Sequence, residues 1–212
     1  MAAGVAHEIN TPLGIILGYT QLMMDDFEEG NENHSNLKVV ERQTKACRRI
    51  VADLLKFSRQ SESAKTLLDI NTIIQEVLAV SEHTLNINQI QVIRKFDHDL
   101  PHIIGDAEKL RQVFINLFNN AQYALKDGGE IVITTGQTEK QVTLSVRDDG
   151  TGVPAEIKNR IFDPFFTTKD VGKGTGLGLS VTYGIIQEHQ GSISVESPVY
   201  DHETKTLLDG TA

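Results

Sequence analysis

A histidine close to the N-terminus has the neighbours that nucleophilic chemistry needs. From His7 the chain reads HEINTPLG, so a carboxylate, Glu8, follows the imidazole directly. A neutral imidazole attacks well near pH 7, and a nearby carboxylate can stabilise the charge that develops on the ring. At helical spacing Thr11, Gly14 and Gly18 share the face of His7, which leaves room for a bulky reactant. The alternative is a solvated surface histidine, and a phosphate donor elsewhere in the chain would decide between the two.

Two asparagines in a long amphipathic segment could serve such a donor. Asn116 and Asn120 are four residues apart and therefore lie on one face of a predicted helix. An amide oxygen is a neutral, hard ligand that suits Mg²⁺ already paired with phosphates. The alternative is a pair of ordinary helix-surface amides.

An acidic residue and two glycines follow a predicted strand. Asp148 stands at the end of that strand, and Gly150 and Gly152 come directly after it. A carboxylate in this place can accept a hydrogen bond from the amino group of adenine, while glycines allow the backbone to approach the ring. Taken alone, the segment is equally compatible with a plain Asp-Gly turn.

A glycine-rich run leads into the last predicted helix. Glycine occupies every second position from residue 172 to residue 178, and the candidate nucleotide-binding positions are Gly174, Thr175, Gly176, Leu177 and Gly178. Such a run provides a mobile lid with exposed amides next to a helix N-terminus, and both suit phosphates. It matches neither a Walker A motif nor a GxGxxG fingerprint. A flexible linker is the alternative, although linkers do not usually continue as an apolar helix.

Aromatic and basic residues lie between these two glycine motifs. Phe162 opens a run of three aromatics that could anchor or swing the lid. Arg160, Lys169 and Lys173 are the local cations available to phosphates in an otherwise acidic region.

The histidine requires a helical scaffold. Apolar residues recur at helical spacing up to about Phe27, where Ile9, Leu13, Ile16, Met23 and Phe27 share one face, and again in a 3-4-3-4 pattern at Leu37, Val40, Thr44, Cys47, Val51, Leu54 and Ser58. Ser35 or Asn36 is the expected N-cap of the second helix. The apolar stripe of this hairpin is too wide for one partner, so the pattern predicts a dimer that forms a four-helix bundle, with Cys47 packed in its seam.

The asparagines and glycines require a different scaffold. Beyond a linker near residues 60–63, helices alternate with strands, which favours an α+β sandwich. The expected helices are 71–85, 106–126 and 177–189, and the expected strands are 90–96, 130–135, 142–146 and 192–195. The predicted domains are therefore residues 1–62 and 63–212.

Composition excludes several classes of protein. The 212 residues carry a formal charge of −9, which argues against a nucleic-acid binder because that function needs a basic face. A single Cys excludes an intrachain disulfide and favours a reducing, cytoplasmic compartment. The sequence contains neither a stretch apolar enough for a membrane span nor a signal peptide.

Taken together and in this order, the motifs resemble the catalytic core of a bacterial sensor histidine kinase. The H box contains His7, the N box spans Asn116–Asn120, G1 spans Asp148–Gly152, the F box spans Phe162–Phe166 and G2 spans Gly174–Gly178. The resemblance implies a dimeric phosphotransfer hairpin followed by an ATP-binding α/β sandwich of the Bergerat type, which gyrases, chaperones, kinases and mismatch-repair proteins share. The lid and the segment after it are similar to the nitrogen-regulator branch.

The resemblance also implies roles for individual residues. His7 would take the γ-phosphoryl group of ATP with help from Glu8, Asn120 would bind Mg²⁺, and Asp148 would bind adenine. The phosphoryl group would then pass to an Asp of a response-regulator receiver domain, and Thr11 would assist its later removal.

Departures from the family pattern occur near the N box. Many relatives carry Lys and then an aromatic residue at the positions of Tyr123 and Ala124, so Arg160, Lys169 or Lys173 would have to replace that lysine. Asn116 stands where related ATPases carry a water-activating Glu, which favours transfer to histidine over hydrolysis. The alternatives are an ATP-driven clamp without phosphotransfer and a non-catalytic docking scaffold. Both ends of the sequence resemble truncations.

Overall fold

The computed structural model describes residues 2–58, 65–170 and 174–197. The chain divides into two compact units. The first unit comprises Met1–Glu62 together with Asp163–Leu177, and the second comprises Ser63–Phe162 together with Gly178–Ala212. The predicted boundary at residues 62 and 63 lies outside the described residues.

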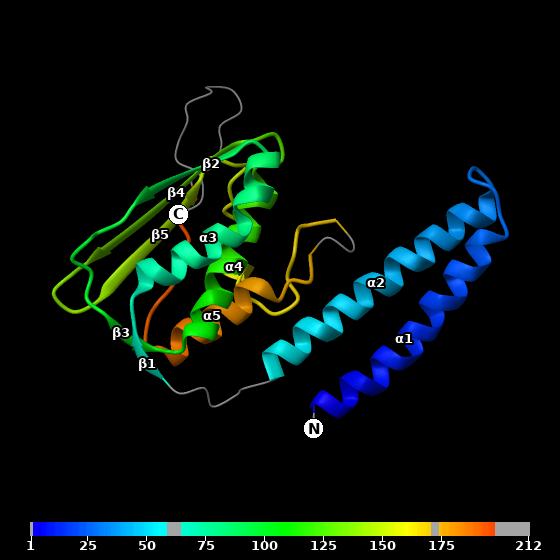
Figure 1. The fold of residues 1–212 in the computed structure, drawn as a ribbon, viewed down its shortest axis with the longest axis horizontal. Coiled ribbons are helices and arrows are strands. Elements are labelled where there is room, and N and C mark those ends of the chain that lie inside the picture. The colour runs from blue at the N-terminus through cyan, green and yellow to red at the C-terminus, as the bar shows by residue number, and fades with distance from the viewer. Residues whose placement is uncertain (1, 59–64, 171–173, 198–212) are drawn as a thin grey trace. The chain divides into compact units, whose positions relative to one another are not determined.

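Two long antiparallel helices form the hairpin of the first unit (Figure 1). They are α1 (Ala2–Asp25) and α2 (Glu32–Ser58). The prediction of Ser35 or Asn36 as the N-cap of the second helix is wrong, because α2 begins about one turn earlier. The side chain of Asn31 accepts a hydrogen bond from the N–H of Asn33 at 2.8 Å, and a short polar side chain is well suited to this position.

The apolar stripe of the hairpin divides into an inner face and an outer face. Thr20 on α1 and Thr44 and Val51 on α2 are buried within the chain. By contrast, several residues of the predicted stripes are exposed, namely Ile9, Ile16, Met23, Val40 and Cys47. Only part of the stripe is therefore buried within a single chain, as expected for a stripe that is too wide for one partner. The side chains of Leu54 and Ser58 lie outside the description.

The second unit is a sheet covered by helices. Its strands β2 (Ile90–Lys95), β4 (Gly129–Gln137) and β5 (Val142–Asp148) lie in the order β2-β4-β5, with β2 parallel to β4 and β4 antiparallel to β5. The helices are α3 (Ile70–Ile87), α4 (Ala107–Ala124) and α5 (Gly178–Glu188), with a 3₁₀ turn, η1, at Lys158–Arg160. Asp69 and Asp106 cap α3 and α4 by accepting backbone N–H bonds, as short polar side chains at this position do.

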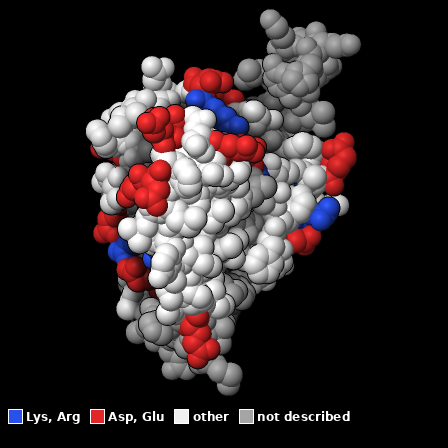
Figure 2. Space-filling view, turned by 90° about the vertical axis from the view of Figure 1, so that its right-hand side faces the viewer, with Lys and Arg blue, Asp and Glu red and all other residues white. Residues whose placement is uncertain are grey.

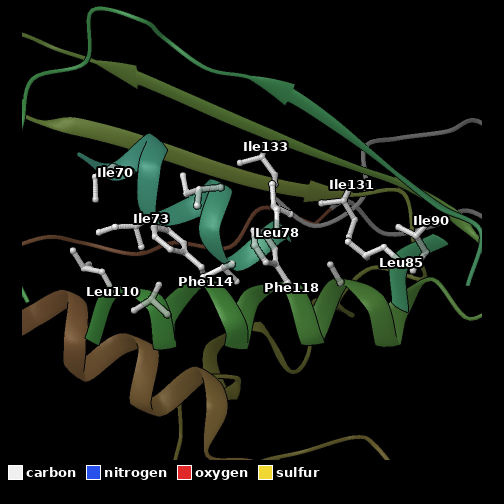
Figure 3. Close-up of a cluster of buried hydrophobic side chains, with 14 of the residues drawn as sticks. Ile70, Ile73, Leu78, Leu85, Ile90, Leu110, Phe114, Phe118, Ile131 and Ile133 are labelled. Carbon is white, nitrogen blue, oxygen red and sulfur yellow. The ribbon is translucent and has the colours of Figure 1, made fainter. Parts of the chain in front are cut away.

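The core lies between the sheet and the helices α3 and α4 (Figure 3). Ile74 of α3 and Ile131 and Ile133 of β4 are almost completely buried, and Phe114 and Phe118 of α4 pack in the same cluster. Complete burial of one such side chain contributes roughly 1.5–3 kcal/mol. This packing holds α4 on the sheet, so the predicted α+β arrangement is confirmed.

Strand predictions failed where pairing depends on distant residues. Ser192–Val195 forms no β ladder with any described residue, so the strand predicted there is not observed. Conversely, β1 (Thr66–Leu68) and β3 (Ile103–Gly105) form an antiparallel pair that was not predicted. Three residues are too few to show a period of two, and their pairing joins segments nearly 40 residues apart.

Among the described residues, no helix is both long enough and apolar enough to cross a membrane.

Candidate functional site

Asn116 joins the middle of α4 to the start of α5. Its amide nitrogen donates to the carbonyl oxygen of Gly178 at 2.9 Å and lies 3.3 Å from the hydroxyl oxygen of Thr182. Its amide oxygen accepts from the side chain of Gln112 at 2.9 Å. The core packing of α4 and this bond together position the residue where the glycine-rich run becomes a helix. Asn120 lies one helical turn further along and is partly buried.

The opposite ends of these two helices are also joined. The backbone N–H of Asp106, which caps α4, donates to Nε2 of His189 at 3.0 Å. Nδ1 of the same ring lies 2.8 Å from the carbonyl oxygen of Ile185. Because Nε2 faces a donor and Nδ1 faces an acceptor, these contacts fit the tautomer that carries its proton on Nδ1. Sequence reasoning assigned His189 no specific role, since its partner Asp106 is 83 residues away.

The acidic residue predicted to bind adenine is buried at the end of β5. Asp148 is 7% exposed, and its carboxylate accepts the N–H of Gly150 at 3.0 Å. Burial raises the pKa of this carboxyl, the hydrogen bond from Gly150 opposes the rise, and the charge of Asp149 adds to it. A Cβ on Gly150 would lie 2.6 Å from the Cβ of Ala124, so only glycine lets this loop approach the end of α4. The loop after β5 therefore combines a buried carboxylate acceptor with a closely approaching backbone.

The adjacent acid, Asp149, has a different task. Its carboxylate accepts the backbone N–H of Glu130 at 2.7 Å and therefore fixes the start of β4 against the end of β5. A Cβ on Gly129 would lie 2.5 Å from that carboxylate, which explains why a glycine with φ of +146° precedes Glu130. Sequence reasoning did not single out Asp149, because nothing local distinguishes it from Asp148.

The far side of the G1 loop is fixed by a serine that was also missed. Gly152 has a φ of +69°, a conformation that favours glycine, and the next residue, Val153, donates its N–H to the hydroxyl of Ser197 at 2.7 Å. Ser197 is buried. Further along, the ring of Phe162 packs against that of Tyr183 in α5, with centroids 5.6 Å apart. Both contacts join segments far apart in sequence.

The segment Asp163–Leu177 contains the rest of the F box and most of G2. Gly176 has a φ of +68°, and a Cβ there would lie 2.6 Å from the carbonyl oxygen of Phe165 and 2.7 Å from the nitrogen of Phe166. Phe165 itself has a φ of +67°, which is a strained value for a non-glycine residue. The two motifs are therefore in backbone contact, and they form one structural element.

The remaining predicted lid residues have individual environments. A Cβ on Gly174 would meet the hydroxyl of Thr167 at 2.7 Å, and Leu177 is buried. Thr175 is partly buried. Burial lowers the pKa of the Lys169 ammonium. Lys173 lies outside the described residues.

A lysine that was not predicted lies beside the N box. The ammonium of Lys126 sits 4.7 Å from the ring centroid of Tyr123, which is a cation–π distance. Tyr123 occupies the position where the family pattern has its lysine, so a cation is present near this turn although it comes from a different residue.

The histidine motif lies on α1. The helix includes His7 and continues through Pro12, and the side chain of His7 is outside the description. Glu8 and Thr11 are exposed, and a Cβ on Gly14 would meet nothing within 4 Å. The face predicted to receive a bulky reactant is therefore open at Gly14.

The donor set fits a metal-bound nucleotide better than a free metal ion. The described residues contain no group of three or more His, Cys, Asp or Glu side chains that could hold a metal. In the face shown in Figure 2, acidic groups form separate clusters and basic groups are few, with no continuous basic patch among the residues described there. An amide oxygen, as on Asn116 or Asn120, is a neutral, hard ligand that suits Mg²⁺ already paired with phosphates.

Comparisons with known proteins agree with this geometry. The family model described as "His Kinase A (phospho-acceptor) domain" matches residues 1–63, and the one described as "Histidine kinase-, DNA gyrase B-, and HSP90-like ATPase" matches residues 105–209. Sporulation kinase A of Bacillus subtilis (strain 168) is 41% identical over 93% of this chain. The chain spans only 32% of the length of that relative.

Solved structures show the same likeness. The nucleotide-free catalytic domain of histidine kinase ThkA is 35% identical, with a TM-score of 0.59 over 64% of this chain and 89% of that one. ThkA in complex with the response regulator protein TrrA is 29% identical, with a TM-score of 0.66 over 93% of this chain and 57% of that one. Full-length ShkA in complex with AMPPNP is 26% identical, with a TM-score of 0.68 over 93% of this chain and 42% of that one.

Proposed function

The chain belongs to the sensor histidine kinases, and on that premise we propose that it phosphorylates His7 from Mg²⁺-ATP and passes the phosphoryl group to a response regulator. The observation that carries the ATP half of this proposal is the buried carboxylate of Asp148 beside Gly150, at the end of the helix that holds Asn116 and Asn120. The phosphoacceptor half is supported by the match of residues 1–63 to the phospho-acceptor family.

Each residue has a defined task in this proposal. Asp148 accepts a hydrogen bond from the amino group of adenine. The amide oxygen of Asn120 would bind the Mg²⁺ that arrives with the phosphates. The backbone amides of residues 174–178 cover the phosphates. When bound, Mg²⁺ supplies charge neutralisation for phosphoryl transfer, and the protein supplies alignment.

The hairpin supplies the acceptor. His7 attacks the γ-phosphorus, and the bond from that phosphorus to the bridging oxygen breaks as ADP leaves. Glu8 stabilises the imidazolium that forms, and Thr11, one turn along, positions water for later dephosphorylation of the partner. That partner is a receiver domain, as the complex of ThkA with TrrA suggests.

A second copy of the chain is part of the proposal. Large apolar side chains on α1 and α2 are exposed in the single chain, among them Ile16, Tyr19 and Leu22, which are 45%, 66% and 65% exposed. A homodimer that pairs two hairpins in a four-helix bundle would bury them. The phospho-acceptor family match supports the same assembly.

The test is incubation with Mg²⁺ and γ-labelled ATP. We expect label on the protein that is lost in acid and retained in base, that is absent in His7→Gln, and that moves to a receiver domain. ATP hydrolysis without protein label would instead support the clamp-type ATPase, and label in His7→Gln would exclude this acceptor. Asn120→Ala should abolish labelling while the dimer remains.

A further inference from the structure

The carbonyl of Gly178 is the point at which the glycine-rich run becomes α5, and it is fixed by two side chains. Asn116 donates to it from α4 at 2.9 Å, and the hydroxyl of Thr182 donates to it from within α5, also at 2.9 Å. Thr182 is completely buried. Because a carbonyl oxygen only accepts, the amide nitrogen of Asn116 must be the atom that faces it, so its orientation is determined.

The amide of Asn116 is engaged on its other side as well. Its oxygen accepts from Gln112 one turn earlier on α4, at 2.9 Å. Gln112, Asn116 and Thr182 therefore form one connected set of hydrogen bonds between two helices. All of its members belong to the same compact unit.

We propose that Asn116 and Thr182 are positioning residues that hold Gly178 in place before ATP arrives. Gly178 is the C-terminal anchor of the glycine-rich run. The proposal rests on the proposed function and adds Thr182, which lies outside every sequence motif named above. A fixed anchor reduces the conformational entropy that residues 174–177 lose when they become ordered around phosphates. Loss of the anchor therefore weakens ATP binding more than it slows transfer from bound ATP.

Thr182→Val is the decisive substitution, because it removes the hydroxyl and keeps the branched shape. We expect the KM for ATP to rise about tenfold with kcat nearly unchanged, since loss of one buried hydrogen bond corresponds to roughly one order of magnitude. Thr182→Ser, which retains the hydroxyl, should recover most of the affinity.

A measurement without nucleotide separates this proposal from the proposed function. Amide hydrogen exchange in Thr182→Val should accelerate in residues 174–185 and remain unchanged in α3. Ser81→Ala is the matched control, because Ser81 makes the same kind of bond to Val77, at 3.1 Å, within α3. It should change neither the exchange of residues 174–185 nor the KM.

The outcomes divide clearly. Faster exchange confined to residues 174–185, together with the higher KM, supports the anchor. An unchanged KM with unchanged exchange overturns it, and so does an equal acceleration throughout the second unit, which would indicate general destabilisation. A protein that incorporates no label at all would refute the proposed function, whereas the exchange result would still test the anchor.

Discussion

Gly176→Ala tests the backbone contact between the F box and G2. Gly176 has a φ of +68°, and an added Cβ would lie 2.6 Å from the oxygen of Phe165 and 2.7 Å from the nitrogen of Phe166. A left-handed conformation costs an alanine about 1–2 kcal/mol. Carbon atoms normally stay about 3.5 Å or more from other heavy atoms, so the backbone of Phe165 and Phe166 would have to move by about 1 Å. Overpacking of this kind costs roughly 1–3 kcal/mol.

These two costs add to roughly 2–5 kcal/mol against the observed arrangement. If ATP binding requires that arrangement, affinity should fall by at least about 30-fold, because each 1.4 kcal/mol corresponds to a factor of ten. Isothermal calorimetry with Mg²⁺-ATP would measure it. The melting temperature of the sandwich should change little, since none of the described residues of Asp163–Leu177 belongs to the buried core cluster.

Gly184→Ala is the matched control for this experiment. Gly184 lies inside α5, and a Cβ there would meet nothing within 4 Å. Alanine should stabilise the helix by about 0.5–1 kcal/mol and leave ATP affinity unchanged. If Gly176→Ala bound ATP as tightly as the unmodified chain, the argued link between the F box contact and nucleotide binding would be refuted.

Two further predictions concern the second unit. Asp148→Asn should lower ATP affinity roughly 10- to 150-fold, as expected for loss of a hydrogen bond to a charged group, and should raise the melting temperature of the ATP-free protein at pH 7. The sign follows from the raised pKa of Asp148: the folded state holds the proton more tightly than the unfolded chain, so ionisation destabilises the fold as the pH rises above the unfolded value of about 3.9. Calorimetry between pH 4 and 7 would contradict this if the variant gained no stability at pH 7. His189→Ala should leave the N–H of Asp106 without its acceptor and lower the melting temperature by roughly 2–10 °C. His189→Gln should lower the melting temperature by less. His83→Ala, at an exposed site on α3, should leave it almost unchanged. Equal losses in all three histidine variants would show that the bond to Asp106 contributes no stability.

What could be read from the sequence was local and periodic. The helix that carries Asn116 and Asn120 was predicted because its apolar residues repeat over five turns, and the structure places it at Ala107–Ala124. Asp148 was singled out because it ends a strand just before glycines. The strands β1 and β3 show no such pattern, since three residues cannot display a period.

Contacts between distant segments account for what the sequence could not show. Asp148 and Asp149 are chemically identical neighbours, yet Asp148 is buried at the last position of β5, whereas Asp149, just past the strand, accepts the N–H of Glu130. Ser197 is 44 residues from Val153, and Thr182 is 66 residues from Asn116. No local pattern can identify such a partner, because the fold alone creates the proximity.

The acidic charge of the ATP-binding half explains why these distant contacts matter for nucleotide binding. Residues 63–212 contain 13 basic and 20 acidic residues, a balance of −7 that repels an anionic nucleotide at long range. Affinity must therefore arise from short-range donors held in place before binding. The loops around the site are fixed by backbone N–H groups that donate to side chains, as Gly150 does to Asp148 and Val153 to Ser197. Hydrogen bonds of this kind position the loops before the nucleotide arrives, and they use no cationic side chain.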